Sequence, residues 1–260
     1  MDLYELTLPN GIRMVHLPVA SRVAHCGLFI HAGSREETDR EHGIAHFIEH
    51  TIFKGTERRS VFQVLNRLEN VGADLNAFTT KEETVIHASF LREYYDRTLE
   101  LFQDLFFNAV FPERELEREK QVVMDEIRSY RDMPDEQIFD DFEDLVFAGH
   151  PLGRNVLGTE KSVRKFRRED ILGFIHRNYR LGEVVIASGL GGSRRRAKML
   201  RITSSLAAPA SRASRTASST ASRPSSRTLA STRTKRRSAS SPEPSRLRSR
   251  VRAGGRDQSW

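Results

Sequence analysis

The residues of this chain best suited to chemistry are two histidines and a glutamate in the stretch His46-Phe-Ile-Glu49-His50. If this stretch is helical, His46 and His50 lie four residues apart on one face, and their imidazoles can hold one metal ion. Glu49 is adjacent to His50, so its carboxylate reaches the edge of the same site. Neutral imidazoles bind zinc well, and a free carboxylate nearby can take a proton from a zinc-bound water molecule. The pattern H-x-x-E-H is the inverted form of the zincin motif.

The alternative to a metal site is an amphipathic helix that contains two histidines by chance. The apolar residues Ile44, Phe47, Ile48 and Ile52 would bury one face of this helix. Histidines on a buried helix need polar partners or a metal. The combination of motif and buried flanks therefore favours a metal site over a pair of structural histidines.

The charge of the chain is distributed very unevenly. Residues 191–260 contain 18 of the 42 Lys and Arg residues and 2 of the 35 Asp and Glu residues. Residues 1–190 are therefore acidic, although the chain as a whole has a formal net charge of +7. All Phe and Tyr residues also lie in residues 1–190, which have a length typical of one domain with its own core.

The sequence contains little that would direct the protein to a membrane or out of the cell. Cys26 is the only cysteine, which excludes an intramolecular disulfide. The first residues have no basic region followed by an apolar one, so we expect no signal peptide. No apolar run has the length of a membrane span. We expect a cytoplasmic protein without a membrane partner.

Alternating apolar and polar residues predict three strands near the N-terminus, over residues 3–8, 12–19 and 23–32, as the start of an antiparallel sheet. The candidate metal helix follows this sheet. Ser60 is suited to begin a second helix. The remaining expected elements are a helix over 61–70, strands over 73–79 and 84–90, helices over 93–108, 112–131, 137–147 and 169–179, and a strand over 184–187.

Two of these features have a functional and a structural interpretation. Strands 73–79 and 84–90 could form a hairpin whose free edge takes a peptide by strand addition, or an ordinary buried hairpin, and the pattern does not separate the two. In the helix over 112–131, Glu119 and Glu126 lie seven residues apart and share a face with valines. Spacing alone favours solvated or salt-bridged carboxylates there over buried ones.

In combination, these motifs resemble the N-terminal half of a pitrilysin/insulinase-family metallopeptidase. The resemblance covers about residues 3–188. The segments that carry it follow the order found in the family, and they are residues 43–55, 75–79, 117–127 and His150-Pro-Leu-Gly-Arg154. The resemblance implies an α+β fold, with an antiparallel or mixed sheet flanked by helices on one side. It also implies a zinc-dependent metalloendopeptidase that acts on peptides or unfolded polypeptides.

The resemblance assigns roles to individual residues. His46, His50 and Glu126 would bind one Zn²⁺ ion, and Glu49 would be the general base. Glu126 follows His50 by 76 residues, as in the family. Glu119 matches a second family glutamate that supports catalysis. The residues that match the substrate-binding strand are Asn76 and Ala77.

The chain departs from the family after residue 190. Family members have a second, similar half that closes on the substrate and contributes an arginine and a tyrosine. No segment after residue 190 resembles that half, so we expect a second homologous half or subunit as partner. A non-catalytic family subunit is the alternative, although such relatives usually lose part of the metal motif, which this chain keeps.

Residues 191–260 contain 17 Ser and 16 Arg but no Phe or Tyr. A segment of this composition cannot bury enough apolar area to fold, so we expect a disordered tail after a metallopeptidase domain over 1–190 that is incomplete at its C-terminal end. One interpretation is a tail that binds nucleic acid electrostatically. A second interpretation is that this segment results from a GC-rich gene translated out of frame, and the composition favours this interpretation. We therefore do not expect a nucleic-acid partner.

Overall fold

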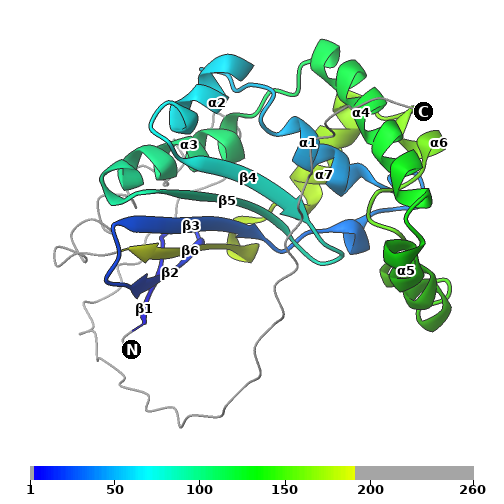
Figure 1. Cartoon of the computed structure of the whole chain (residues 1–260), viewed down its shortest axis with the longest axis horizontal. Coiled ribbons are helices and arrows are strands. Elements are labelled where there is room, and N and C mark those ends of the chain that lie inside the picture. The colour runs from blue at the N-terminus through cyan, green and yellow to red at the C-terminus, as the bar shows by residue number, and fades with distance from the viewer. Residues whose placement is uncertain (1–2, 191–260) are drawn as a thin grey trace, which may run out of the picture. The chain divides into compact units, whose positions relative to one another are not determined.

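The computed structural model describes residues 3–190. These residues form an α+β fold in which helices gather on one face of a six-stranded mixed sheet (Figure 1). This is the predicted fold class. The tail predicted over residues 191–260 lies outside the described residues.

The sheet has the strand order β1-β2-β6-β3-β5-β4. The parallel pair is β2 with β6, and the other neighbours are antiparallel. The three N-terminal strands were predicted to start an antiparallel sheet. β1 and β2 are antiparallel neighbours, but β6 lies between β2 and β3, with Ile186 opposite both Met14 and Leu28. A strand with apolar residues on both faces suits such a central place. The bounds are β1 Tyr4–Thr7, β2 Arg13–Pro18, β3 Val23–Ile30, β4 Asp74–Thr79, β5 Thr84–Leu91 and β6 Val184–Leu190.

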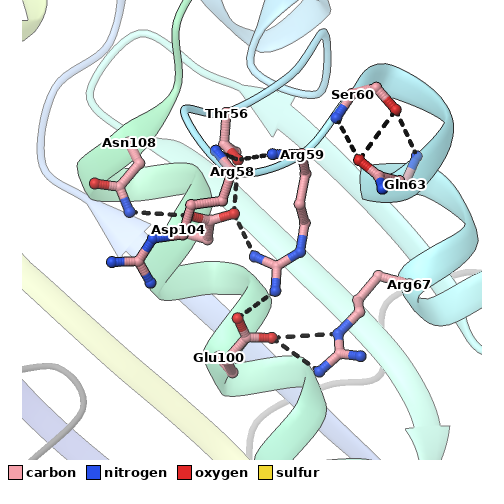
Figure 2. Close-up of polar contacts among 9 residues, drawn as sticks. All are labelled: Thr56, Arg58, Arg59, Ser60, Gln63, Arg67, Glu100, Asp104 and Asn108. Atoms are coloured by element: carbon pink, nitrogen blue, oxygen red, sulfur yellow. Dashed lines mark hydrogen bonds and ion pairs between the residues drawn. The ribbon is translucent and has the colours of Figure 1, made fainter.

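Seven α-helices connect these strands within the described residues. They are α1 Ile44–Thr51, α2 Val61–Glu69, α3 Tyr95–Asn108, α4 Glu113–Arg131, α5 Pro134–Val146, α6 Glu160–Val163 and α7 Arg168–Asn178. Ser60 begins α2 as predicted, because its hydroxyl accepts from Gln63 N while the Gln63 side chain accepts from Ser60 N (Figure 2). None of the helices in residues 3–190 combines the length and apolar character that a membrane crossing requires.

The hydrophobic core combines residues of the sheet with buried residues of α1, α2, α3, α4 and α7. The apolar residues Ile44, Phe47 and Ile48 of α1 are completely buried, as the sequence predicted. They pack in the same core as the inward-facing residues of the sheet, among them Leu28 and Ile86. Burial of this face fixes the direction in which the polar residues of α1 point.

A polar network fastens the segment after α1 to α3 (Figure 2). Asp104 on α3 is buried and accepts hydrogen bonds from the Thr56 hydroxyl at 2.7 Å and from Asn108 Nδ2 at 2.9 Å. The Arg59 guanidinium lies between Asp104 and Glu100 and pairs with both. This network anchors the chain directly after α1.

Helix α5 lies where the sequence predicted a helix over residues 137–147, and its apolar side faces outward. Its apolar residues Phe139, Phe142 and Leu145 are exposed among the described residues, and Leu145 retains 80% of its accessible surface. The polar side of the helix faces the protein instead, because Asp140 accepts hydrogen bonds at 2.7 Å from both Tyr130 and Asn155. An apolar stripe in the sequence therefore does not identify the face that packs on this domain.

Candidate metal centre

The candidate ligands come from two helices that are distant in the sequence and adjacent in the fold. His46 and His50 lie on the same face of α1, with their Nε2 atoms 3.2 Å apart. Glu126 on α4 places its Oε2 atom 3.2 Å from His50 Nε2 and 3.7 Å from His46 Nε2. One ligand atom from each of the three residues assigned as ligands by the family resemblance therefore lies within 4.8 Å of the other two.

These distances suit a tetrahedral metal ion. Ligand atoms about 2.0–2.1 Å from zinc at the corners of a tetrahedron lie about 3.4 Å from one another. The three separations here are 3.2, 3.2 and 3.7 Å. Two imidazoles and one carboxylate are also the ligand types of catalytic zinc sites, which leave a fourth position open. The residues present therefore fit zinc.

Glu119 supports the second ligand from behind. Its Oε2 atom lies 3.4 Å from His50 Nδ1, on the side of the ring away from the candidate metal position. Its other oxygen pairs with Lys54 Nζ at 2.5 Å, and the Glu119 side chain is only 12% exposed. A carboxylate behind a ligand histidine fixes the ring and raises its basicity. His46 has no such support, because its buried Nδ1 has no hydrogen-bond partner among residues 3–190.

The centre perturbs the protonation of its own groups. Burial, together with the neighbouring His50, lowers the pKa of His46 to about 4. Burial opposes a charge on His50 as well, but the hydrogen bond and charge of Glu126 outweigh it and raise the pKa. The hydrogen bond from His50 lowers the pKa of Glu126. A neutral imidazole and an ionised carboxylate are the states that bind a metal.

Glu49 of α1 lies beside the candidate ligands and next to Thr79 at the end of strand β4. Burial raises the pKa of its carboxyl, and Thr79, the last residue of β4, acts against this rise. A carboxylate whose pKa is raised toward neutrality is suited to accept a proton and release it. The predicted general base therefore lies next to the candidate ligands.

Strand β4 is an edge of the sheet in the described residues and pairs only with β5. This geometry corresponds to the open-edged hairpin rather than to the buried one. Asn76 is exposed, and its side-chain oxygen accepts from Ala77 N at 2.9 Å. An incoming strand that pairs with Ala77 N must therefore displace this local hydrogen bond.

Three residues that contact α1 or the candidate ligands' partners were not found from the sequence. Lys54 follows His50 by four residues, a spacing that could have suggested it. Thr79 and Glu37 have no such signal, because Thr79 approaches Glu49 from the end of a strand and Glu37 approaches the start of α1 from a loop.

Comparison with known proteins identifies the family to which this fold and this set of candidate ligands belong. Residues 15–160 match the family described as "Insulinase (Peptidase family M16)". The chain therefore belongs to this peptidase family.

Similar proteins include several peptidases. The chain is 37% identical over 70% of its length to a probable mitochondrial-processing peptidase subunit beta of Arabidopsis thaliana, of which it covers 34%. It is 38% identical over 70% of its length to the uncharacterized zinc protease YmxG of Bacillus subtilis, covering 44% of that protein. The solved first half of the periplasmic protease PqqL from Escherichia coli matches 78% of the chain with a TM-score of 0.72 and 25% identity, and 45% of that structure is covered. The chain thus spans less than half the length of these proteins.

Proposed function

We propose that this chain is the zinc-binding part of a metalloendopeptidase that hydrolyses peptides or unfolded polypeptides. The observation that carries the proposal is the convergence of His46, His50 and Glu126 on one position, with Glu49 beside it. The likeness to proteins named zinc protease supports the choice of zinc.

In this proposal His46, His50 and Glu126 hold the ion. When bound, zinc would acidify a water molecule and polarise the carbonyl of the scissile peptide bond. Glu49 accepts the proton of the attacking water and passes it to the leaving amine. The pKa of Glu49, which burial raises, suits both transfers. Glu119 keeps the His50 ring in place, and the edge of β4 at Asn76 and Ala77 holds the substrate backbone in an extended form.

The partner in this proposal is a second homologous half or subunit. The chain covers less than half of its relatives, and two of them are named as a subunit and as the first half of a protease. A second half would enclose the substrate against the β4 edge and exclude water from the site.

The test is to measure zinc content and peptide cleavage in the same preparations. We expect about one zinc per wild-type chain, retained in Glu49→Gln and lost in His46→Ala. Cleavage by the wild type, with a candidate partner half added, should fall at least about 1000-fold in Glu49→Gln. The exposed Glu69→Gln on α2 is the matched control and should behave as the wild type. A wild type without zinc would refute the metal centre, and an active Glu49→Gln would refute the role of Glu49.

A further inference from the structure

A buried glutamate outside the ligand set lies where the metal-binding helix begins. Glu37 is 4% exposed, and both of its carboxylate oxygens are used. Oε2 accepts from Gly43 N at 2.8 Å, and Oε1 accepts from Ala45 N at 2.9 Å. The first amides of a helix have no partners within the helix. Glu37 therefore satisfies two of them from a loop six residues away.

The start of α1 has no other side chain that could do this. The position before the helix is Gly43, which offers no side chain and has φ +90°. A Cβ atom there would lie 2.6 Å from the carbonyl oxygen of Leu157, so the close approach of that loop requires glycine. The usual cap of a serine, threonine, aspartate or asparagine at this position is thus excluded by packing.

Glu37 is itself held from a distant part of the chain. Arg154 Nη1 donates to the backbone carbonyl oxygen of Glu37 at 3.2 Å, and Arg154 also pairs with Asp39. Burial raises the pKa of Glu37, and the hydrogen bonds from Ala45 N and Gly43 N, with the charge of Arg154, act against this rise. The loop after α5 and the loop before α1 are therefore joined through the backbone of Glu37, the residue whose side chain caps α1.

The metal centre depends on where α1 lies. This helix has eight residues, and helices this short are not stable without external contacts. It carries two of the three candidate ligands, whereas α4 carries the third. His46 directly follows Ala45, whose amide Glu37 holds, so a shift of the first turn moves His46 relative to Glu126.

We propose that Glu37 is a positioning residue of the metal centre, which sets the place of the first turn of α1 and thereby the approach of His46 to Glu126. The inference rests on the proposed zinc site. It assigns to the Glu37–Arg154 pair a role in metal affinity that is distinct from any contribution to folding.

Replacing Glu37 by glutamine tests this role. Glutamine has the same shape but only one acceptor oxygen, so its NH₂ group would face one of the two helix amides. We expect the zinc dissociation constant of the full chain to rise about tenfold, as for residues that orient metal ligands. The visible absorption spectrum of the Co²⁺ form should also change. The control is Glu36→Gln, because the Glu36 carboxylate accepts from Gly33 N within its own turn.

The measurements are a competition titration with a chromophoric chelator and the cobalt spectrum, both on protein shown to be folded by circular dichroism. Wild-type zinc affinity and an unchanged cobalt spectrum in folded Glu37→Gln would overturn the positioning role of Glu37 and leave the proposed zinc site standing. If Glu37→Gln does not fold, Arg154→Gln replaces it, with an expected severalfold loss of affinity. Unchanged affinity in Arg154→Gln would then overturn the inference. A wild type and a Glu36→Gln that bind no zinc would overturn the proposed function and this inference with it.

Discussion

Two polar clusters in the described residues are built in opposite ways. In the network between the segment after α1 and α3, Arg59 lies between the carboxylates of Asp104 and Glu100, so opposite charges alternate (Figure 2). In the metal centre, two imidazole nitrogens face each other at 3.2 Å, and a carboxylate completes the group. The charged groups of the first cluster pair with one another, whereas the second cluster presents several ligand atoms to one position.

The pKa shifts show the same contrast. Burial opposes ionisation of Asp104, but hydrogen bonds from Asn108, Thr56 and Arg59 keep its pKa below the usual value. In the metal centre, burial dominates and lowers the pKa of His46 to about 4. Groups that stabilise one another hold the fold together. Groups whose desolvation is not outweighed by a neighbouring counter-charge, such as His46, are typical of sites that bind a ligand.

The largest expected effect is the loss of zinc binding in His50→Ala. Removing one of three ligands should weaken zinc affinity by more than about 1000-fold, whereas the stability of the metal-free protein should change by only about 1 kcal/mol. His87→Ala, on the partly exposed face of β5, is the control for loss of an imidazole. Competition titration and denaturation in the presence of a chelator measure the two quantities. Strong zinc binding by His50→Ala would contradict the claim that this cluster, unlike the Arg59 network, is built to bind a metal.

Asp104→Ala should strongly reduce the stability of the protein and leave its zinc affinity nearly unchanged. Removing the buried carboxylate leaves the Thr56 hydroxyl without its acceptor and Arg59 with Glu100 as its remaining partner, which should cost about 3–5 kcal/mol of unfolding free energy. Zinc affinity of the folded variant should stay within about threefold of the wild type. Asp96→Ala, an exposed position on the same helix, should cost less than about 1 kcal/mol. Urea unfolding provides the measurement, and a large zinc effect in Asp104→Ala would show that the two clusters are coupled.

A third prediction concerns pH. Burial raises the pKa of Glu37 from 4.5 to about 8, against the hydrogen bonds from Ala45 and Gly43. Between these values the folded protein holds a proton that the unfolded chain has released, so stability falls as pH rises from about 5 to 8. Glu37→Gln lacks this proton. The stability of the metal-free wild type relative to Glu37→Gln should therefore decrease with pH, by at most about 1.4 kcal/mol per pH unit. A difference that is constant from pH 5 to 8 would contradict the raised pKa.

The smallest expected effect is that of Glu100→Gln. Glu100 pairs with Arg59 and Arg67, but its side chain is 35% exposed, so solvent screens these ion pairs. We expect a loss of about 1 kcal/mol or less, reduced further in 1 M NaCl. Thermal unfolding at low and high salt tests this. A loss as large as that of Asp104→Ala would mean that the whole network, rather than its buried carboxylate, stabilises α3.

The sequence predicted the elements better than their arrangement. The hairpin of β4 and β5 and the start of α2 at Ser60 followed from turn residues and capping signals, which act over a few positions. The insertion of β6 between β2 and β3 did not follow, because strand pairing joins residues more than 150 positions apart. The outward face of α5 was missed because periodicity detects an apolar side without indicating what covers it.

For the candidate site, the sequence by itself determined the pair on α1. The helical repeat alone brings His46 and His50 onto one face of α1. The apolar residues between them, Phe47 and Ile48, hold the helix against the core. Only the tertiary structure decided the rest. The approach of Glu126 and Glu119 on α4, the support of α1 by Glu37, and the free edge of β4 all depend on how separate elements pack. Spacing along the chain alone favoured a solvated Glu126, because no local repeat encodes a contact made across 76 residues.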